Sequence, residues 1–268
     1  MEVVPLATAT DVARLAADTI EALVRRRAAA GTPAVLGLAT GSTPLATYAE
    51  LLARRGAGTA PSYEGVRTFN LDEYVGLPPG HEQSYLATIR RELTDGLAIP
   101  PERVHGPDPT PDTLPLAGER YEQEIRDAGG IDLQVLGIGT DGHIGFNEPG
   151  SSLASLTRIK TLTARTRRDN ARFFGAEDDP GGVPHHVLTQ GIATILRAGH
   201  LLLLATGEAK AAAVAAAVEG AVTASCPASA LQFHPHASVI LDEGAASRLT
   251  RLDYYREVWA EKPDWQGL

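Results

Sequence analysis

Five short apolar runs alternate with segments of helical pattern along this chain of 268 residues. Each run is about as long as a β-strand and is apolar nearly throughout, which suits parallel strands covered on both faces. The alternation predicts a single α/β domain over residues 1–268, built on one doubly wound, mostly parallel sheet flanked by helices. We expect strands at 34–39, 66–71, 132–138, 200–205 and 237–241, and helices at 10–30, 43–55, 81–95, 115–128 and 208–219.

Charge and cysteine content exclude several classes of protein. The net charge of −9 and the 5% of aromatic residues argue against a nucleic-acid groove. Cys226 is the only cysteine, so no intramolecular disulfide is expected, and the N-terminus lacks a signal-peptide pattern. The apolar stretch after His200 is far shorter than the roughly 18 residues that span a bilayer. We expect a cytoplasmic protein with a small-molecule ligand and neither nucleic-acid nor membrane partners.

In doubly wound sheets ligands bind beyond the carboxyl ends of the strands, so the residues after each run are the candidates. The first run leads into Gly41, Ser42 and Thr43 at a helix start, where free N–H groups and two hydroxyls suit a phosphate. An ordinary helix cap is the alternative interpretation.

The fourth run leads into Lys210, in the first turn of a helix. A lysine there opposes the helix dipole unless an anion lies between them. The chain otherwise uses arginine almost throughout, and its other lysines are Lys160 and Lys262. A phosphate shared by Lys210 and the Ser42–Thr43 turn would explain why a lysine stands at this position.

The second run ends in Asn70, Leu71, Asp72 and Glu73. Acidic side chains directly after a buried strand are costly unless they face a cleft or a cation. We therefore expect Asp72, the acid nearest the strand end, to point into the site. A turn or helix-start acid is the alternative.

The third run opens a glycine-rich loop that holds Asp141, His143 and Glu148. A histidine flanked by carboxylates is the usual arrangement of a proton shuttle. The loop matches GxGxxG, but neither the helix nor the later acid of a dinucleotide site follows. With one cysteine and no HExxH motif, a three-ligand metal site is the weaker alternative. We expect no metal and no cofactor.

Four motifs, LGLATGSTPLATY, FNLDEYVGLPPGHEQSY, LGIGTDGHIGFNEPGSSLASLTRIKTL and ATGEAKAAAVAAAVEG, stand in this order along nearly the whole chain. Together they closely resemble the glucosamine-6-phosphate deaminase (glucosamine-6-phosphate isomerase) family. The resemblance implies a Rossmann-like enzyme of amino-sugar catabolism that converts glucosamine 6-phosphate and water to fructose 6-phosphate and ammonia. This reaction couples an aldose–ketose isomerisation to hydrolytic loss of the amine.

The resemblance also implies roles for single residues. Asp72 would move a proton between C2 and C1, and His143 would open the pyranose ring, with Asp141 and Glu148 orienting and charging it. A segment of about 160–184 would act as a mobile lid. The substrate phosphate would be held by Gly41, Ser42, Thr43, Arg172 and Lys210.

Part of this family forms hexamers that N-acetylglucosamine 6-phosphate activates at a site between subunits. The resemblance therefore implies an allosteric homo-hexamer, and a packing role for the stretch around Lys160 is the alternative. The segment from Leu249 departs most from the family pattern. The matching effector residues are Ser151, Ser152, Arg158, Lys160 and Tyr254.

Three other functions are alternatives. A 6-phosphogluconolactonase would share the fold, the phosphate loop and a GxGxDGH motif but lacks FNEP, so Asn147 and Glu148 favour the deaminase. A non-catalytic sugar-phosphate sensor would carry a DNA-binding module before its first strand. We expect that strand near residue 34, with a single helix before it, which leaves no room for such a module. An inactive homologue would have lost the four acid–base residues, all of which are present.

Overall fold

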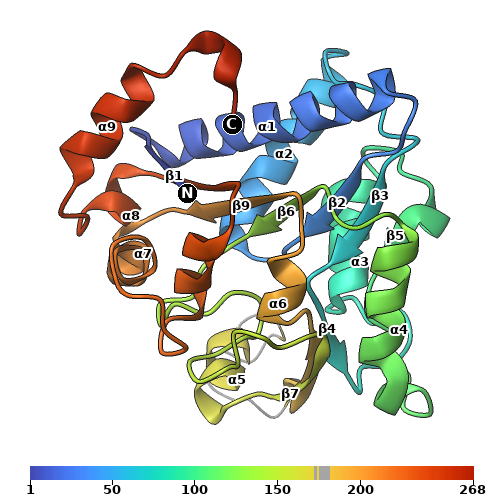
Figure 1. The fold of residues 1–268 in the computed structure, drawn as a ribbon. Coiled ribbons are helices and arrows are strands. Elements are labelled where there is room, and N and C mark those ends of the chain that lie inside the picture. Colours follow the sequence, from blue (N-terminus) through green and yellow to red (C-terminus); the bar gives the residue numbers. More distant parts are fainter. Residues whose placement is uncertain (172–173, 175–181) are drawn as a thin grey trace.

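A seven-stranded parallel sheet forms the centre of the computed structural model, which describes residues 1–171, 174 and 182–268 (Figure 1). Its strand order is β1-β10-β9-β6-β2-β3-β5, and every neighbouring pair is parallel. The predicted fold class is confirmed. The strands of this sheet are β1 Glu2–Pro5, β2 Val35–Leu38, β3 Arg67–Asn70, β5 Val104–His105, β6 Leu133–Leu136, β9 His200–Ala205 and β10 Ala237–Leu241.

Helices cover both faces of this sheet, as its apolar strands require. One face packs on α1 and α2, and the other on α4, α7 and α8. None of the helices in the described part of the chain is long and apolar enough to cross a membrane. The helices are α1 Ala9–Ala29, α2 Ser42–Gly56, α3 Tyr85–Ile89 with a π-helical turn Arg90–Thr94, α4 Leu114–Asp127, α5 Ala164–Ala171, α6 Ile192–Ile195, α7 Ala211–Val218, α8 Glu243–Ala246 and α9 Leu252–Ala260; short 3-10 turns span Pro101–Arg103, Glu208–Lys210, Pro227–Phe233 and Asp264–Gln266.

The expectation that the first strand begins near residue 34 is wrong. Residues Glu2–Pro5 form β1, an edge strand that pairs in parallel with β10. The four-residue run EVVP is too short for a periodicity to show, and its partner lies more than 230 positions away along the chain. Helix α1 starts one residue earlier than predicted, and its N-cap is Thr8, whose side chain accepts a hydrogen bond from the Asp11 amide. Helix α9 packs beside β1, and Lys262 pairs with Glu2 at 2.5 Å.

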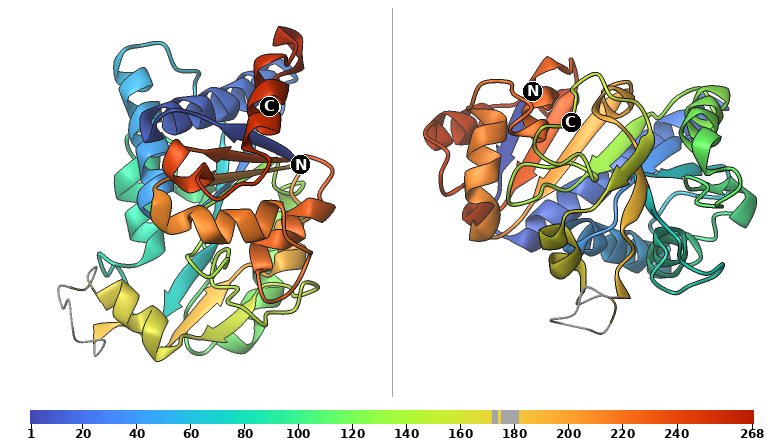
Figure 2. Two further views of the ribbon diagram at one scale, coloured as in Figure 1. Left: turned by 90° about the vertical axis from the view of Figure 1, so that its left-hand side faces the viewer. Right: turned by 90° about the horizontal axis from the view of Figure 1, so that it is seen from below.

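A second, three-stranded antiparallel sheet was not predicted. Its order is β4-β8-β7, with β4 Asp72–Val75, β7 Arg158–Thr161 and β8 His186–Thr189. Strand β4 follows β3 after a single residue, Leu71, where the chain bends from the central sheet into the small one. The small sheet extends at one end of the molecule, away from α1 (Figures 1 and 2).

A glycine allows α4 to lie directly against the segment that enters β7. A Cβ atom built on Gly118 would come within 2.3 Å of the Thr157 carbonyl oxygen. Backbone cannot give way as a flexible side chain can, so this helix position accepts no larger residue.

We predict that Gly118→Ala lowers the free energy of unfolding by about 1–3 kcal/mol, because the added methyl separates α4 from Thr157. Gly56→Ala is the matched control, since a Cβ there meets nothing within 4 Å at the end of α2, and it should gain up to about 1 kcal/mol. Urea unfolding followed by circular dichroism measures both. Equal stability of the two variants would contradict the close approach.

Candidate active site

Four predicted loops meet at the carboxyl ends of the strands of the central sheet. They follow β9, β6, β2 and β3, which are consecutive neighbours and parallel, so their carboxyl ends lie together. The chain continues from β2 toward β3 on one side and from β6 toward β9 on the other. This reversal of direction between β2 and β6 is the position at which doubly wound sheets bind their ligands.

Asp72 lies at the junction of the two sheets, where it is the first residue of β4 and is separated from β3 by Leu71 alone. Its side chain is buried, with 6% of the residue exposed. Burial and, to a smaller extent, the negative charge of Glu73 together raise the pKa of Asp72 to about 8. A carboxyl group with a pKa near neutrality suits proton transfer.

Glu73, unlike Asp72, has a structural role. Its carboxylate accepts hydrogen bonds from the amides of Tyr74, Tyr85 and Leu86 at 2.8–2.9 Å. It thereby holds the start of α3, beside the N-cap Ser84. Of the two acids after β3, Asp72 is the one that remains for a site.

His143 is paired with Asp141 in the loop after β6. The distance from His143 Nδ1 to Asp141 Oδ1 is 2.6 Å, and the His143 amide also donates to this oxygen at 3.2 Å. The hydrogen bond from His143 lowers the pKa of Asp141 to about 2. An ionised carboxylate only accepts, so Nδ1 carries the hydrogen and Nε2 is the nitrogen that can exchange a proton with a ligand.

Glycines allow this loop to pack closely. A Cβ atom on Gly139 would overlap the His143 ring at 2.2 Å. Gly145 has a φ of +56°, and a Cβ there would lie 2.9 Å from Thr189 Oγ1 and 3.7 Å from Asp72 Oδ2. The loop backbone therefore lies against the Asp72 carboxylate, and the expected meeting of this loop with the end of β3 occurs.

Glu148 lies in a different environment from the one expected. Its carboxylate accepts a hydrogen bond from Thr166 of α5. Among the described residues, the carboxylate within ion-pair distance of the His143 ring is that of Asp141. Glu148 thus links the loop to α5 in this structure.

The two glycine turns predicted to bind phosphate also meet. Thr43 Oγ1 lies 3.3 Å from Thr206 Oγ1, which joins the turn after β2 to the turn after β9. Gly41, with φ +133°, is the N-cap of α2, so the Ser42 and Thr43 side chains are not capping groups. The half-buried Lys210 lies in the second turn, whose Gly207 amide donates to Asp242. Arg172 lies outside the described residues, as do residues 173 and 175–181 of the expected lid.

The proposed effector residues divide into two groups. Ser151 is buried, Ser152 is exposed, and Arg158 and Lys160 stand on β7. Burial lowers the pKa of Arg158. Tyr254, 60% exposed, stands on α9, at the opposite end of the molecule from β7 (Figure 1).

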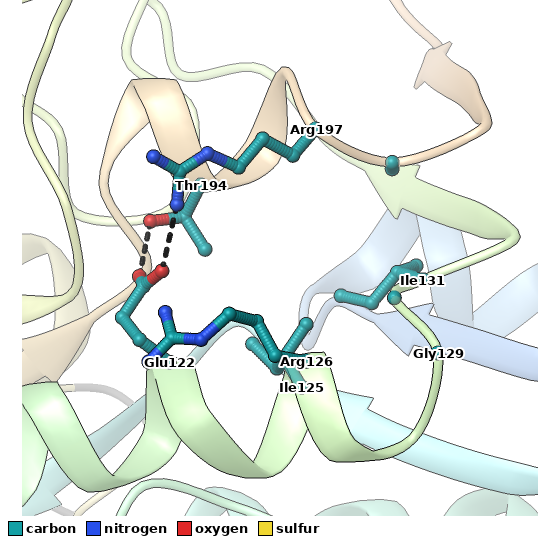
Figure 3. Close-up of a pocket in the computed structure, with 9 residues that line it drawn as sticks. Glu122, Ile125, Arg126, Gly129, Ile131, Thr194 and Arg197 are labelled. Carbon is teal, nitrogen blue, oxygen red and sulfur yellow. Dashed lines mark hydrogen bonds and ion pairs between the residues drawn. The ribbon is translucent and has the colours of Figure 1, made fainter.

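A cavity of about 280 Å³ lies at the amino ends of the strands, beside the residues that precede β6 and β9. Ile125, Ile131 and Ala198 line it. Figure 3 shows Glu122 at its side, bonded to Thr194 and to Arg197 at 3.3 Å. Because ligands of such sheets bind at the carboxyl ends, we assign no substrate to this cavity.

Sequence reasoning missed Thr189 and Gln190 at the end of β8. The Thr189 hydroxyl accepts from the Phe146 amide at 3.1 Å, and the Gln190 amide donates to the Leu71 carbonyl at 2.8 Å. Polar residues after the short apolar run VL were the available signal, the same one that identified Asp72.

Comparison with known proteins identifies the family. The family model of glucosamine-6-phosphate isomerases/6-phosphogluconolactonase matches residues 7–240. The chain belongs to this family. Among curated proteins, the glucosamine-6-phosphate deaminase of Arthrobacter sp. (strain FB24) is 58% identical over 268 residues, which is 100% of both chains.

Solved structures of the glucosamine-6-phosphate isomerase/6-phosphogluconolactonase family share the fold. A monomeric glucosamine-6-phosphate deaminase superposes with a TM-score of 0.87 and 38% identity, covering 92% of this chain and all of that one. A 6-phosphogluconolactonase from Trypanosoma brucei has a TM-score of 0.74 and 21% identity, covering 93% of this chain and 98% of its own. The second similarity concerns the fold alone.

We predict that Asp72→Asn stabilises the protein in alkaline solution. With its folded-state pKa near 8, against about 4 unfolded, wild-type Asp72 lowers the free energy of unfolding as pH rises from about 4 to 8. The asparagine side chain carries no charge, so the melting temperature of the variant relative to wild type should be about 2–6 °C higher at pH 8.5 than at pH 5.

The exposed Asp112 offers the control: Asp112→Asn should shift the melting temperature equally at both pH values. Differential scanning calorimetry measures both variants. A shift for Asp72→Asn that is the same at pH 5 and pH 8.5 would contradict the buried, neutral carboxyl.

Proposed function

We propose that this chain is a glucosamine-6-phosphate deaminase, which converts glucosamine 6-phosphate and water to fructose 6-phosphate and ammonia. The observation that carries the proposal is a buried carboxyl with a pKa near 8, Asp72, against the loop that holds the Asp141–His143 pair. Relatives that bear this name over their whole length support it. In class terms it is a hydrolase of a C–N bond with ketol-isomerase chemistry.

The residues divide the acid–base work. His143 Nε2 takes and returns the proton that opens the pyranose ring, and Asp141 holds the ring and stabilises its charged form. Asp72 then takes the proton from C2 and delivers it to C1, as a positioned carboxylate does in other aldose–ketose isomerisations. Water adds at C2, the amine leaves as ammonia, and the ketose remains. Glu148, the other acid of this loop, would act with Asp141 in orienting His143 and stabilising its charged form.

The phosphate binds between the two glycine turns. Their contact through Thr43 and Thr206 supports one shared anion site. The hydroxyls of Ser42 and Thr43, the Gly41 turn, Lys210 and Arg172 would hold the dianion by charge-assisted hydrogen bonds. We further propose that residues 1–268 act as one catalytic domain in the cytoplasm, with 160–184 as a lid over the bound sugar.

We also propose regulation by N-acetylglucosamine 6-phosphate in a homo-hexamer. Arg158 and Lys160 stand on β7, whereas Tyr254 stands on α9 at the other end of the molecule. A site that contains all of these side chains requires α9 from a second copy. Ser151 and Ser152 would complete it.

The proposed activity predicts equal amounts of ammonia and fructose 6-phosphate from glucosamine 6-phosphate without added cofactor. In deuterium oxide, Asp72→Asn should abolish exchange of the C2 proton, a loss of at least about 1,000-fold, while the phosphate still binds. Because Asp72 acts ionised, kcat/KM should rise with pH up to about 8.

Enzymatic product assays and proton NMR measure these outcomes. 6-Phosphogluconolactone is the control substrate, and its hydrolysis without ammonia release from the amino sugar would favour the lactonase alternative. Absence of both products overturns the assignment. Wild-type exchange in Asp72→Asn removes Asp72 from its role.

The proposed regulation predicts that N-acetylglucosamine 6-phosphate raises the rate at subsaturating substrate and that Lys160→Gln abolishes the rise. Arg91→Gln, a change at an exposed arginine of the α3 region, is the control and should keep it. Light scattering should give six times the chain mass of 28.2 kDa. A monomer with a flat response contradicts the proposal.

A further inference from the structure

Thr189 and Asp72 are directly opposite each other in the antiparallel pair of β8 and β4. Residues at such positions project side chains on the same face of the sheet, with Cβ atoms about 5 Å apart. Thr189 is fully buried. Its side chain therefore lies beside the Asp72 carboxylate, in the interior of the protein.

The Thr189 hydroxyl also holds the loop after β6. Its Oγ1 accepts the Phe146 amide at 3.1 Å, and a Cβ on Gly145 would lie 2.9 Å from the same oxygen. That Cβ position is 3.7 Å from Asp72 Oδ2. One hydroxyl thus fixes the loop backbone where it contacts the carboxylate.

The loop held in this way carries His143, three positions before Phe146. Asp72 and His143 belong to different elements, and neither hydrogen-bonds the other among the contacts of the described residues. Their relative position depends on what ties the loop to β4. Reacting groups must be placed to within fractions of an ångström, so such a tie affects rate more than binding.

We propose that Thr189 is a positioning residue, whose hydroxyl holds the Gly145–Phe146 backbone against Asp72 so that the loop with His143 stands correctly over the substrate. It acts through the Phe146 amide and not by touching substrate. The kinetic part of this inference rests on the proposed function.

The test compares Thr189→Val with Thr189→Ser. Valine keeps the shape and loses the acceptor, so kcat should fall by about 10- to 100-fold with KM within about threefold of wild type. Serine keeps the hydroxyl and should restore kcat to within about threefold. Loosening the loop admits water to Asp72, so the acidic limb of the pH profile should move to lower pH in the valine variant.

Thr68→Val is the matched control. Thr68 is also fully buried, on β3, but its hydroxyl has no hydrogen-bond partner among the described residues. This variant should keep wild-type kcat. If Thr189→Val does not fold, Thr189→Ala, which removes the same acceptor without new bulk, is expected to show the same losses.

Amide hydrogen exchange at Phe146 gives a readout independent of activity. It should be at least about tenfold faster in Thr189→Val than in wild type or Thr68→Val. A kcat or an exchange rate equal to that of Thr68→Val overturns the inference. If wild type releases no ammonia, the proposed function fails. The exchange rate at Phe146 alone then supports or overturns the role of Thr189 in holding the loop.

Discussion

Leu71 is hydrogen-bonded to both sheets, and the site depends on this double attachment. Its amide donates to Leu38 of β2 at 2.9 Å, and its carbonyl accepts from the Gln190 amide after β8 at 2.8 Å. The residue before it ends the parallel sheet and the residue after it begins the antiparallel one. Asp72 is buried because only one residue separates the two covered sheets, and burial is the main cause of its raised pKa.

The five inner strands of the central sheet were predictable because their signals are local, whereas the edge strands β1 and β5 were not predicted. Strands β9 and β10 have the predicted bounds, and β2, β3 and β6 lie inside the predicted runs. Strands β2, β9 and β10 are largely apolar, since both faces of the sheet are covered, whereas β3 and β6 also carry buried polar side chains. The small sheet was not predictable in this way, because β7 reads RIKT with alternating exposure and β4 reads DEYV with two acids. These strands form through pairing with distant segments and not through their own pattern.

The site was predictable where chemistry forces a choice of residue. An acid after a buried strand and a histidine in a glycine-rich loop have few structural explanations, and the structure brings Asp72 and that loop together. What could not be predicted is how the pieces are held. Thr189, Glu73 and Thr166 act through hydrogen bonds to partners up to 43 positions away, and threonines in general carry no signature of such a role.

The two edges of the central sheet are both unsuited to pairing with another chain. Strand β1 ends in Pro5, which has no N–H to donate, and α9 lies beside it with Lys262 paired to Glu2. At the other edge β5 has only two residues. Short or proline-bearing edges discourage the strand addition that leads to aggregation. Any contact between copies at these two edges would therefore use side chains, and single substitutions could change such a contact without altering the sheet.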